Sequence, residues 1–301
     1  MPIVINVDGR IGGERDGVVS VLDHGFLYGE GVYEVVRTYN RTPFLFDRHL
    51  QRMRRSAEMI RLPVPFTDAE IEQRMRQTTD VFYAQADREA DDVYVRILLT
   101  RGVGEISYDP AACRAPTLVV IVKPHIGLSA EVYERGVKVA LVPVIRNHPG
   151  SINPLIKSNN LLNNALAAQE ALRRNAFEGI MHNYRGEISE GSISNLFVVM
   201  NGSLITPPID AGLLAGITRG YVIELATGAG VTIRESVLHD EDLFGANEAF
   251  VTSSTQEIVP VVQIDEQSIG TGRPGPVTRT LLERYRQKVA EMTGAKLVDG
   301  R

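Results

Sequence analysis

The sequence predicts an α+β fold of mixed strands and helices that is divided into two domains. Strand and helix signals alternate along the chain without the regular βαβ period of a doubly wound parallel sheet. The length of 301 residues exceeds what one hydrophobic core usually serves, so more than one domain is expected. Apolar residues make up 44% and charged residues 23% of the chain, which excludes a largely disordered or coiled-coil protein.

Strand signals dominate the N-terminal third of the chain. β-Branched runs at residues 3–5 and 18–21, with the turn signal Asp8-Gly9 between them, predict a hairpin at the start of the chain. Further strands are expected over residues 32–39, 44–46, 92–100 and 117–122.

Two helices are predicted among these strands. Asp47 is expected to be the N-cap of a helix that ends at Ile60, because apolar residues recur on one face of that stretch. Thr67 and Glu70 have the spacing of a capping box, in which each side chain bonds to the backbone of the other residue. A second helix is therefore expected from Thr67 onward.

A linker at residues 123–130 is predicted to divide the chain, because Pro, Gly and Ser occur there between two apolar strands. We expect a small N-terminal α/β domain at 1–122 and a larger C-terminal domain at 131–301. In the larger domain we expect strands near 136–145, 231 and 248–264, and helices over 158–174, 217–227 and 276–292.

Charge and composition exclude several classes of protein. The formal net charge is −5 and no basic block occurs, which argues against a nucleic-acid-binding protein. No apolar run reaches the roughly 18 residues that a membrane span needs, and the first ten residues lack the layout of a signal peptide. The single cysteine, Cys113, suits a reducing compartment, so a cytoplasmic protein is expected.

The sequence predicts neither a metal site nor a nucleotide-binding loop. The six histidines are scattered, without an i, i+4 pair or cysteine partners, so zinc would lack its usual ligands. The segment 29–31 (GEG) lacks the third glycine of the dinucleotide fingerprint and precedes a strand. Neither a phosphate loop ending in Gly-Lys nor a Gly-x-Ser-x-Gly nucleophile elbow is present.

Lysine is scarce in this chain, which restricts any chemistry that needs an amine. Only five of the 32 basic residues are lysines, and the others are arginines. Lys157 lies between an apolar approach and the expected start of a helix, where partial desolvation favours the neutral amine that forms Schiff bases. For the residue taken alone, a solvated lysine at a helix start is the simpler interpretation.

Three further motifs place polar groups at strand or helix ends. Glu190, followed by a glycine and small hydroxyl residues, can face a cavity without crowding it. Residues 216–219 (GITR) open a helix whose first amides can hold an anion, and residues 252–255 (TSST) provide a row of donors after a strand. Each motif has an ordinary alternative: a glutamate that faces water, an N-cap, or a turn.

In this order and spacing the motifs resemble those of the class IV pyridoxal-phosphate aminotransferases, the fold type IV family. The resemblance covers nearly the whole chain, from residues 23–34 (DHGFLYGEGVYE) to residues 252–260 (TSSTQEIVP). It implies a small N-terminal α/β domain and a larger C-terminal domain around a pseudo-barrel. It also implies a homodimer or larger homo-oligomer that binds pyridoxal 5′-phosphate, amino acids and 2-oxo acids, with the active site near the subunit interface.

The resemblance implies a role for particular residues at the cofactor. Lys157 matches the lysine that binds the cofactor as a Schiff base and then moves a proton. Glu190 matches the carboxylate that faces the pyridine nitrogen and keeps it protonated. Arg52 matches the phosphate-binding arginine, whose guanidinium fork suits a phosphate dianion. The rest of the phosphate site is expected from Ile217, Thr218 and Ser254.

The substrate-pocket motifs resemble mainly those of the branched-chain enzymes of the family. Tyr94 and Arg96 match the Tyr-x-Arg of those enzymes, and residues 100–104 (TRGVG) resemble their archaeal and bacterial forms. Tyr28 and Tyr33 match aromatic positions that line the pocket. The expected substrate-binding set is Tyr28, Tyr33, Tyr94, Arg96 and Thr255.

The D-amino-acid enzymes of the family are the alternative. They place an arginine and a histidine just after Thr-Arg-Gly to bind the substrate carboxylate, whereas Ile106 and Tyr108 occupy those places here. In favour of this alternative, residues 32–36 (VYEVV) and 190–195 (EGSISN) resemble D-specific enzymes. Leu161 also stands where branched-chain enzymes usually carry a tyrosine.

We therefore expect a ping-pong transamination between a branched-chain L-amino acid and 2-oxoglutarate. A D-amino-acid aminotransferase is the first alternative, and an aminodeoxychorismate lyase on the same scaffold is the second. A non-catalytic cofactor-binding protein is disfavoured because Lys157, Glu190 and Arg52 occur together.

Overall fold

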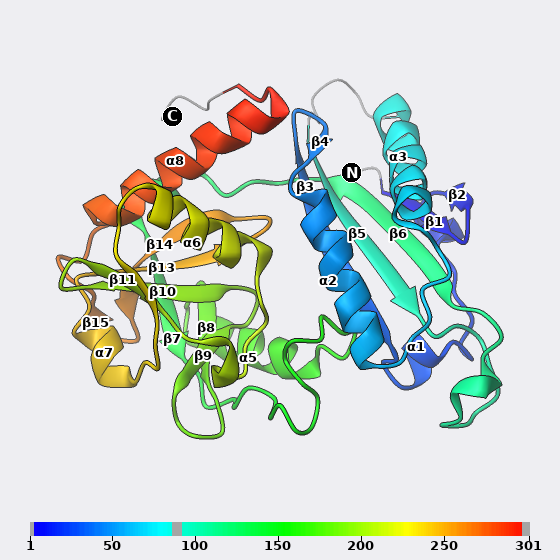
Figure 1. The fold of residues 1–301 in the computed structure, drawn as a ribbon, viewed down its shortest axis with the longest axis horizontal. Helices are drawn as coiled ribbons and strands as arrows, with labels where there is room; N and C mark the ends of the chain where they lie inside the picture. The colour runs from blue at the N-terminus through cyan, green and yellow to red at the C-terminus, as the bar shows by residue number, and fades with distance from the viewer. Residues whose placement is uncertain (1–2, 86–91, 297–301) are drawn as a thin grey trace. The chain divides into compact units, whose positions relative to one another are not determined.

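The computed structural model describes residues 3–85 and 92–296 and confirms the mixed α+β architecture (Figure 1). The chain forms two compact units. The first comprises Met1–Ile126, Ile156–Asn160 and Thr293–Ala295, and the second comprises Gly127–Leu155, Leu161–Met292 and Lys296–Arg301. Within the described residues, no helix is both long and apolar enough to cross a membrane.

The first unit is built on a six-stranded antiparallel sheet with the strand order β2-β1-β6-β5-β3-β4. The central strands β5 and β6 stay in register from the pair Val93 and Pro124 to the pair Thr100 and Thr117. The strands are β1 (Val4–Val7), β2 (Arg10–Gly12), β3 (Gly31–Tyr39), β4 (Thr42–Pro43), β5 (Val93–Thr100) and β6 (Thr117–Pro124).

Two helices, α2 (Phe46–Met59) and α3 (Asp68–Gln85), cover one face of this sheet (Figure 1). Residues along β5 alternate between buried and half-buried, so only one face of the sheet contributes to the hydrophobic core. The opposite face carries Tyr94 and Arg96. The short helices of the unit are α1 (His24–Leu27) and the 3₁₀ turns Glu14–Asp16 and Pro110–Ala112.

The second unit is built on a nine-stranded mixed sheet with the order β12-β11-β10-β13-β14-β7-β8-β9, and β15 pairs with β14. Its strands are β7 (Val137–Leu141), β8 (Glu178–His182), β9 (Ile188–Gly191), β10 (Asn195–Met200), β11 (Ser203–Thr206), β12 (Ile233–Glu235), β13 (Glu248–Ser253), β14 (Glu257–Ile264) and β15 (Gln267–Ser268). Its helices are α4 (Ala130–Arg135), α5 (Leu162–Arg173), α6 (Ile217–Gly228), α7 (Asp240–Phe244), α8 (Pro276–Thr293) and the 3₁₀ turn Ile209–Ala211.

The predicted N-terminal hairpin exists, but its second strand was placed wrongly. Asp8 and Gly9 both have positive φ, at 50° and 91°, which is the conformation of a two-residue hairpin turn. Such a turn brings the very next residues back along β1, so β2 forms at Arg10–Gly12. The predicted strand at 18–21 lies outside the sheet, and Val18 is 67% exposed.

The prediction for residues 44–46 was also wrong, because helix α2 begins there. Leu45 has left-handed φ and ψ of 52° and 38°, which ends the extended backbone and makes Leu45, instead of Asp47, the N-cap. The capping box of α3 is confirmed. The Thr67 amide donates to the Glu70 carboxylate at 2.6 Å, and the Glu70 amide donates to the Thr67 hydroxyl at 3.2 Å.

Two further predicted boundaries, of the linker and of a helix, differ in the structure because the chain there pairs with strands. β6 continues into the predicted linker, because Lys123 and Pro124 still pair with β5, and α4 begins at Ala130, the last linker residue. The helix predicted from Ser158 begins only at Leu162. Residues 156–160 instead cluster with the first unit, although they fall within the range 131–301.

Candidate active site

Lys157 lies in an extended segment beside β3, and not at the mouth of a helix as predicted. The Tyr33 amide donates to the Lys157 carbonyl at 2.9 Å, and the Asn159 amide donates to the Gly31 carbonyl at 2.9 Å. The Lys157 amide in turn donates to the Ser56 hydroxyl of α2 at 3.1 Å. The backbone of Lys157 is therefore fixed to both the sheet and the helix that packs on it.

The side chain of Lys157 contacts an aromatic ring that the sequence assigned to the substrate pocket. The Lys157 Nζ lies 4.6 Å from the centroid of the Tyr33 ring, and the Arg96 guanidinium carbon lies 4.1 Å from the same centroid. Both are within the range of cation–π attraction. The structure thus brings Lys157, Tyr33 and Arg96 together on the half-buried face of the first sheet.

Tyr94 lies on the same face of this sheet. It is opposite Arg37 in the β3–β5 pair and two residues before Arg96 on β5, so the two β5 side chains point the same way. The Lys123 Nζ lies 4.8 Å from the centroid of the Tyr94 ring. This face therefore combines tyrosine rings with cationic side chains, an arrangement suited to the carboxylate of an amino acid.

Arg52, on α2, is buried in an ion pair that sequence reasoning did not anticipate. Its Nε and Nη2 donate to the two carboxylate oxygens of Glu34, each at 2.7 Å, and His49 Nδ1 lies 2.7 Å from the same carboxylate. Burial alone would raise the pKa of Glu34, but the charge of Arg52 and the hydrogen bonds of Arg52 and His49 lower it to about 2. Burial lowers the pKa of His49, which favours the neutral imidazole.

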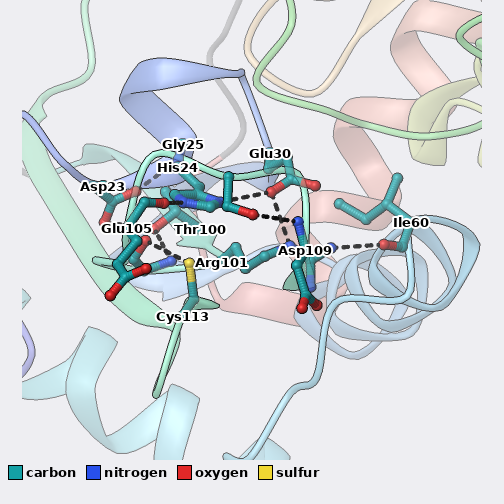
Figure 2. A network of polar contacts seen from close by, with 12 residues as sticks. Asp23, His24, Gly25, Glu30, Ile60, Thr100, Arg101, Glu105, Asp109 and Cys113 are labelled. Carbon is teal, nitrogen blue, oxygen red and sulfur yellow. Dashed lines mark hydrogen bonds and ion pairs between the residues drawn. The ribbon is translucent and has the colours of Figure 1, made fainter. Parts of the chain in front are cut away.

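Tyr28 follows α1, in a region where a polar network joins two loops (Figure 2). His24 Nδ1 lies 3.2 Å from Glu30, and Arg101 Nε donates to the same Glu30 oxygen at 2.9 Å. Asp23 accepts a hydrogen bond from the Thr100 hydroxyl at 2.9 Å. The network therefore fixes the segment that carries Tyr28 to the end of β5.

The ring of Tyr28 packs within this region. It makes an edge-to-face contact with His24 at 4.9 Å and a tilted contact with Tyr108 at 5.1 Å between ring centroids. Tyr108 and Ile106 occupy the places where the D-amino-acid enzymes carry a carboxylate-binding pair. Their side chains are 88% and 75% exposed.

In the second unit, Glu190 on β9 is held through both of its carboxylate oxygens. Arg146 Nε donates to Oε1 at 2.7 Å, and Oε2 accepts from Asn195 Nδ2 at 3.2 Å and from the Leu214 amide at 3.0 Å. Glu190 and Arg146 are both buried. A carboxylate held by a guanidinium and two amide donors is stabilised in its ionised form.

The predicted phosphate site lies at the start of α6. Its N-cap is Gly216, and no side chain of the described residues caps this end of the helix. The amides of Ile217 and Thr218 belong to the first turn, where helix amides lack intrahelical partners and the helix dipole favours anions. This arrangement suits a phosphate group.

Ser254 and Thr255 follow β13, in the turn that leads to β14. β13 pairs with β10, which places Asn195 opposite Thr252, and the Thr252 hydroxyl is buried without a hydrogen-bond partner among the described residues. Beyond the turn, Glu257 has a positive φ of 62°, and Arg286 of α8 donates to its carboxylate at 2.8 Å. The ion pair fixes the end of the turn.

The predicted site residues fall into two groups, one in each unit. The groups are Lys157, Arg52, Tyr28, Tyr33, Tyr94 and Arg96 in the first unit, and Glu190, Ile217, Thr218, Ser254 and Thr255 in the second. Sequence reasoning missed Glu34 and Arg146, the ionic partners of Arg52 and Glu190. Glu34 could have been found, because it occupies a core-facing position in the alternation of β3. Arg146 lies in a loop and gave no signal.

A family model described as amino-transferase class IV matches residues 31–264. The chain belongs to the class IV aminotransferases. A putative branched-chain-amino-acid aminotransferase of Methanocaldococcus jannaschii is 36% identical over 295 residues, which cover 98% of this chain and 99% of that protein. The D-alanine aminotransferase of Bacillus licheniformis is 31% identical over 293 residues, which cover 97% of this chain and 99% of that enzyme.

A solved structure supports the same assignment. The T.th. branched-chain amino acid aminotransferase, complexed with N-(5′-phosphopyridoxyl)-L-glutamate, matches this aminotransferase with a TM-score of 0.87 at 27% identity. The match covers 97% of this chain and 95% of that chain. The fold type IV architecture expected from the sequence is therefore confirmed.

Proposed function

We propose that this aminotransferase uses pyridoxal 5′-phosphate to transfer the amino group of a branched-chain L-amino acid to 2-oxoglutarate in a ping-pong reaction. The observation that carries the proposal is the placement of Lys157. Its backbone is fixed between β3 and Ser56, and its amine contacts Tyr33 beside Arg96. A nucleophilic lysine needs this kind of fixed position next to groups that can orient a substrate.

The residues of the chain fit the proposed cofactor. The uncapped amides at the start of α6 and the Thr218 hydroxyl suit a phosphate. Arg52 remains the proposed phosphate-binding arginine, with its charge balanced by Glu34. The buried carboxylate of Glu190 suits a protonated ring nitrogen. When bound, the cofactor supplies an electrophilic carbon and a ring that accepts the electron pair of the substrate Cα–H bond.

The chain's own residues supply binding, orientation and proton transfer. Lys157 provides the amine nucleophile, and its Nζ would take the proton from the substrate Cα and deliver it to the electrophilic carbon of the cofactor, with the reverse transfer in the second half of the reaction. Glu190 would hold the proton at the ring nitrogen, because its carboxylate forms an ion pair with Arg146 and faces the ring with negative charge. Arg96 and Tyr94 bind and orient the substrate carboxylate.

Two features support L-branched-chain substrates over D-amino acids. The positions that would carry a carboxylate-binding pair hold Ile106 and Tyr108, which cannot pair with an anion as arginine does. The relative from Methanocaldococcus jannaschii is described as a putative branched-chain enzyme, and the T.th. structure holds an L-glutamate adduct. L-glutamate is the amino acid formed when an L-specific aminotransferase transfers an amino group to 2-oxoglutarate.

The proposal is tested with Lys157→Ala and the control Lys288→Ala, because Lys288 is an exposed lysine on α8. Lys157→Ala is expected to lose the visible absorbance of the bound cofactor and its turnover, and Lys288→Ala is expected to keep both. Normal turnover in Lys157→Ala would contradict the assigned role of this lysine.

The substrate class is tested by half-reactions of the purified enzyme with L-leucine and D-alanine. We expect L-leucine to discharge the visible absorbance and D-alanine to leave it unchanged. A response to D-alanine alone would establish the D-amino-acid alternative. Release of pyruvate from aminodeoxychorismate without amino transfer would establish the lyase.

We also propose that the enzyme is a homodimer or a larger homo-oligomer, because the first unit carries an exposed apolar surface. This surface consists of Leu22, Phe26, Val103, Ile106 and Tyr108. Asp23 pairs with Val103, so the two loops that form the surface lie side by side. Large exposed apolar side chains that cluster in this way are typical of protein interfaces.

Sedimentation equilibrium of Phe26→Asp with Ile106→Asp tests this assembly. The double variant is expected to sediment as a monomer, because two carboxylates would enter an apolar interface. Leu172→Asp, at an exposed leucine of α5 in the second unit, is the control and is expected to leave the assembly unchanged. A monomeric wild-type protein would contradict the proposal.

A further inference from the structure

Glu178, at the start of β8, is a buried glutamate with no assigned role. Its side chain accepts hydrogen bonds from the Ile193 amide at 2.6 Å, the Ser194 hydroxyl at 2.7 Å and the Ser192 hydroxyl at 3.3 Å. Among the described residues, no cationic side chain forms an ion pair with it. These three donors belong to one short loop, residues 191–194.

The loop packs closely on Glu178. The Gly191 amide donates to the Ser194 carbonyl at 2.8 Å, which closes the loop on itself. A Cβ atom at Gly191 would lie 2.4 Å from Glu178 Oε1 and 2.4 Å from the Ser194 hydroxyl, so only glycine allows this approach. Asn164 of α5 also holds the loop, through a hydrogen bond to the Ser192 carbonyl at 2.8 Å.

The two ends of the loop lead to two parts of the proposed cofactor site. Glu190 precedes the loop, and Asn195 follows it. The Asn195 side-chain amide donates to Glu190 Oε2 at 3.2 Å and to the Leu214 carbonyl at 3.0 Å. Gly216, the N-cap of α6, packs so closely on Asn195 that a Cβ there would lie 2.0 Å from Asn195 Oδ1. A shift of the loop would therefore move both the Glu190 carboxylate and the start of α6.

We propose that Glu178 is a positioning residue that holds loop 191–194 and thereby sets the Glu190 carboxylate and the first turn of α6 for the cofactor. The inference rests on the proposed function, in which these two elements bind pyridoxal 5′-phosphate. Glu178 acts only through the loop, and its hydrogen bonds to the Ile193 amide and the Ser194 hydroxyl carry the effect. Burial raises the pKa of this carboxyl, and the hydrogen bonds from the loop oppose that rise.

The experiment measures the Kd of the full-length apoprotein for pyridoxal 5′-phosphate by equilibrium dialysis. Glu178→Ala removes both carboxylate oxygens that accept hydrogen bonds from the loop and is expected to weaken binding at least about tenfold. Glu178→Gln keeps an oxygen for the Ile193 amide and is expected to restore most of the affinity. This rescue separates positioning from a general loss of stability.

Glu248→Ala is the matched control for this comparison. Glu248 is also a buried glutamate of the second unit, and it accepts hydrogen bonds from the Thr278 amide at 2.8 Å and the Thr278 hydroxyl at 2.7 Å. It therefore resembles Glu178 in burial and partners but anchors α8 instead of the loop. Its removal is expected to destabilise the protein without changing the Kd for the cofactor by more than about twofold.

The outcomes distinguish a failure of the proposed function from a failure of the positioning role of Glu178. If the wild-type apoprotein binds no pyridoxal 5′-phosphate, the proposed function fails, whatever Glu178 does. If the wild type binds it and Glu178→Ala binds equally well, or no more weakly than Glu248→Ala, the positioning role is wrong. If Glu178→Ala does not fold, Ser194→Ala replaces it. Weakening of severalfold supports the role, and an unchanged Kd overturns it.

Discussion

Glu34 in the first unit and Glu178 in the second are both buried, with exposed fractions of 1% and 2%, yet their pKa values move in opposite directions. The pKa of Glu34 falls to about 2, and the pKa of Glu178 rises to about 7. Burial raises the pKa of both carboxyls. The difference lies in their partners, because Glu34 contacts Arg52 and His49, whereas Glu178 contacts an amide and two hydroxyls.

A third glutamate shows that neutral donors are not themselves the cause of the raised pKa. Glu70 accepts from the Thr67 amide at 2.6 Å and from the Thr67 hydroxyl at 2.8 Å, which closely matches the donors of Glu178. Glu70 is exposed, and hydrogen bonds from Thr67 lower its pKa. For a carboxyl in water, hydrogen bonds from neutral donors are therefore sufficient to lower the pKa. A buried carboxylate needs a cation to stay ionised at low pH.

The largest expected effect follows from removing the charge of Glu34. Glu34→Gln leaves the buried Arg52 guanidinium without its carboxylate partner, so the free energy of unfolding at pH 7 should fall by about 3–5 kcal/mol. Urea denaturation of the apoprotein measures this change.

Glu72→Gln is the control for this first variant, because Glu72 forms an i, i+4 ion pair with Arg76 on the surface of α3. That pair should contribute less than about 1 kcal/mol. Equal effects of the two variants would show that the buried ion pair does not stabilise the first unit more than a surface pair does.

A smaller effect, with a pH dependence, is expected for Glu178. The pKa of this acid is raised in the folded state from 4.5 to about 7, so the folded protein binds one more proton than the unfolded chain between these values. The stabilisation is complete below about pH 4.5 and is lost as the pH rises through about 7. The loss amounts to at most roughly 3 kcal/mol.

Urea denaturation of wild type and Glu178→Gln at pH 5 and pH 8 measures this loss. The variant cannot ionise, so its stability relative to wild type should increase between the two pH values. Glu190, the charged neighbour that also raises the pKa of Glu178, is present in both proteins. A difference between the two proteins that does not change with pH would show that Glu178 ionises normally.

Local signals in the sequence predicted the structure correctly where neighbouring residues determine it. The capping box of Thr67 and Glu70 correctly predicted the start of α3, and the strand predicted over residues 92–100 is confirmed as β5. Lys157 was selected from five lysines by motif order, but its backbone conformation was predicted wrongly. Its pairing with Tyr33 joins residues more than a hundred positions apart, and no local pattern reports such a contact.

The ionic partners of the site were harder to predict for the same reason. Arg146 is one of many arginines in the chain, and nothing near it in the sequence marks its contact with Glu190. The opposite ionisation of Glu34 and Glu178 likewise depends on which side chains the fold brings to each carboxyl. Burial can be predicted from the alternation of a strand, but the partner of a buried charge cannot.

The smallest of the three effects is expected for Glu70, because water surrounds its carboxylate. Its pKa is lowered in the folded state, so its stabilisation is present above about pH 4.5 and is lost as the pH falls below that value. Glu70→Ala removes one half of the capping box and should lower the urea midpoint at pH 7 by less than Glu34→Gln does. The difference between Glu70→Ala and wild type should shrink towards pH 3, whereas the difference between Glu178→Gln and wild type should change mainly above pH 5. If the difference between Glu70→Ala and wild type instead grew towards pH 3, burial would not be the property that separates these glutamates.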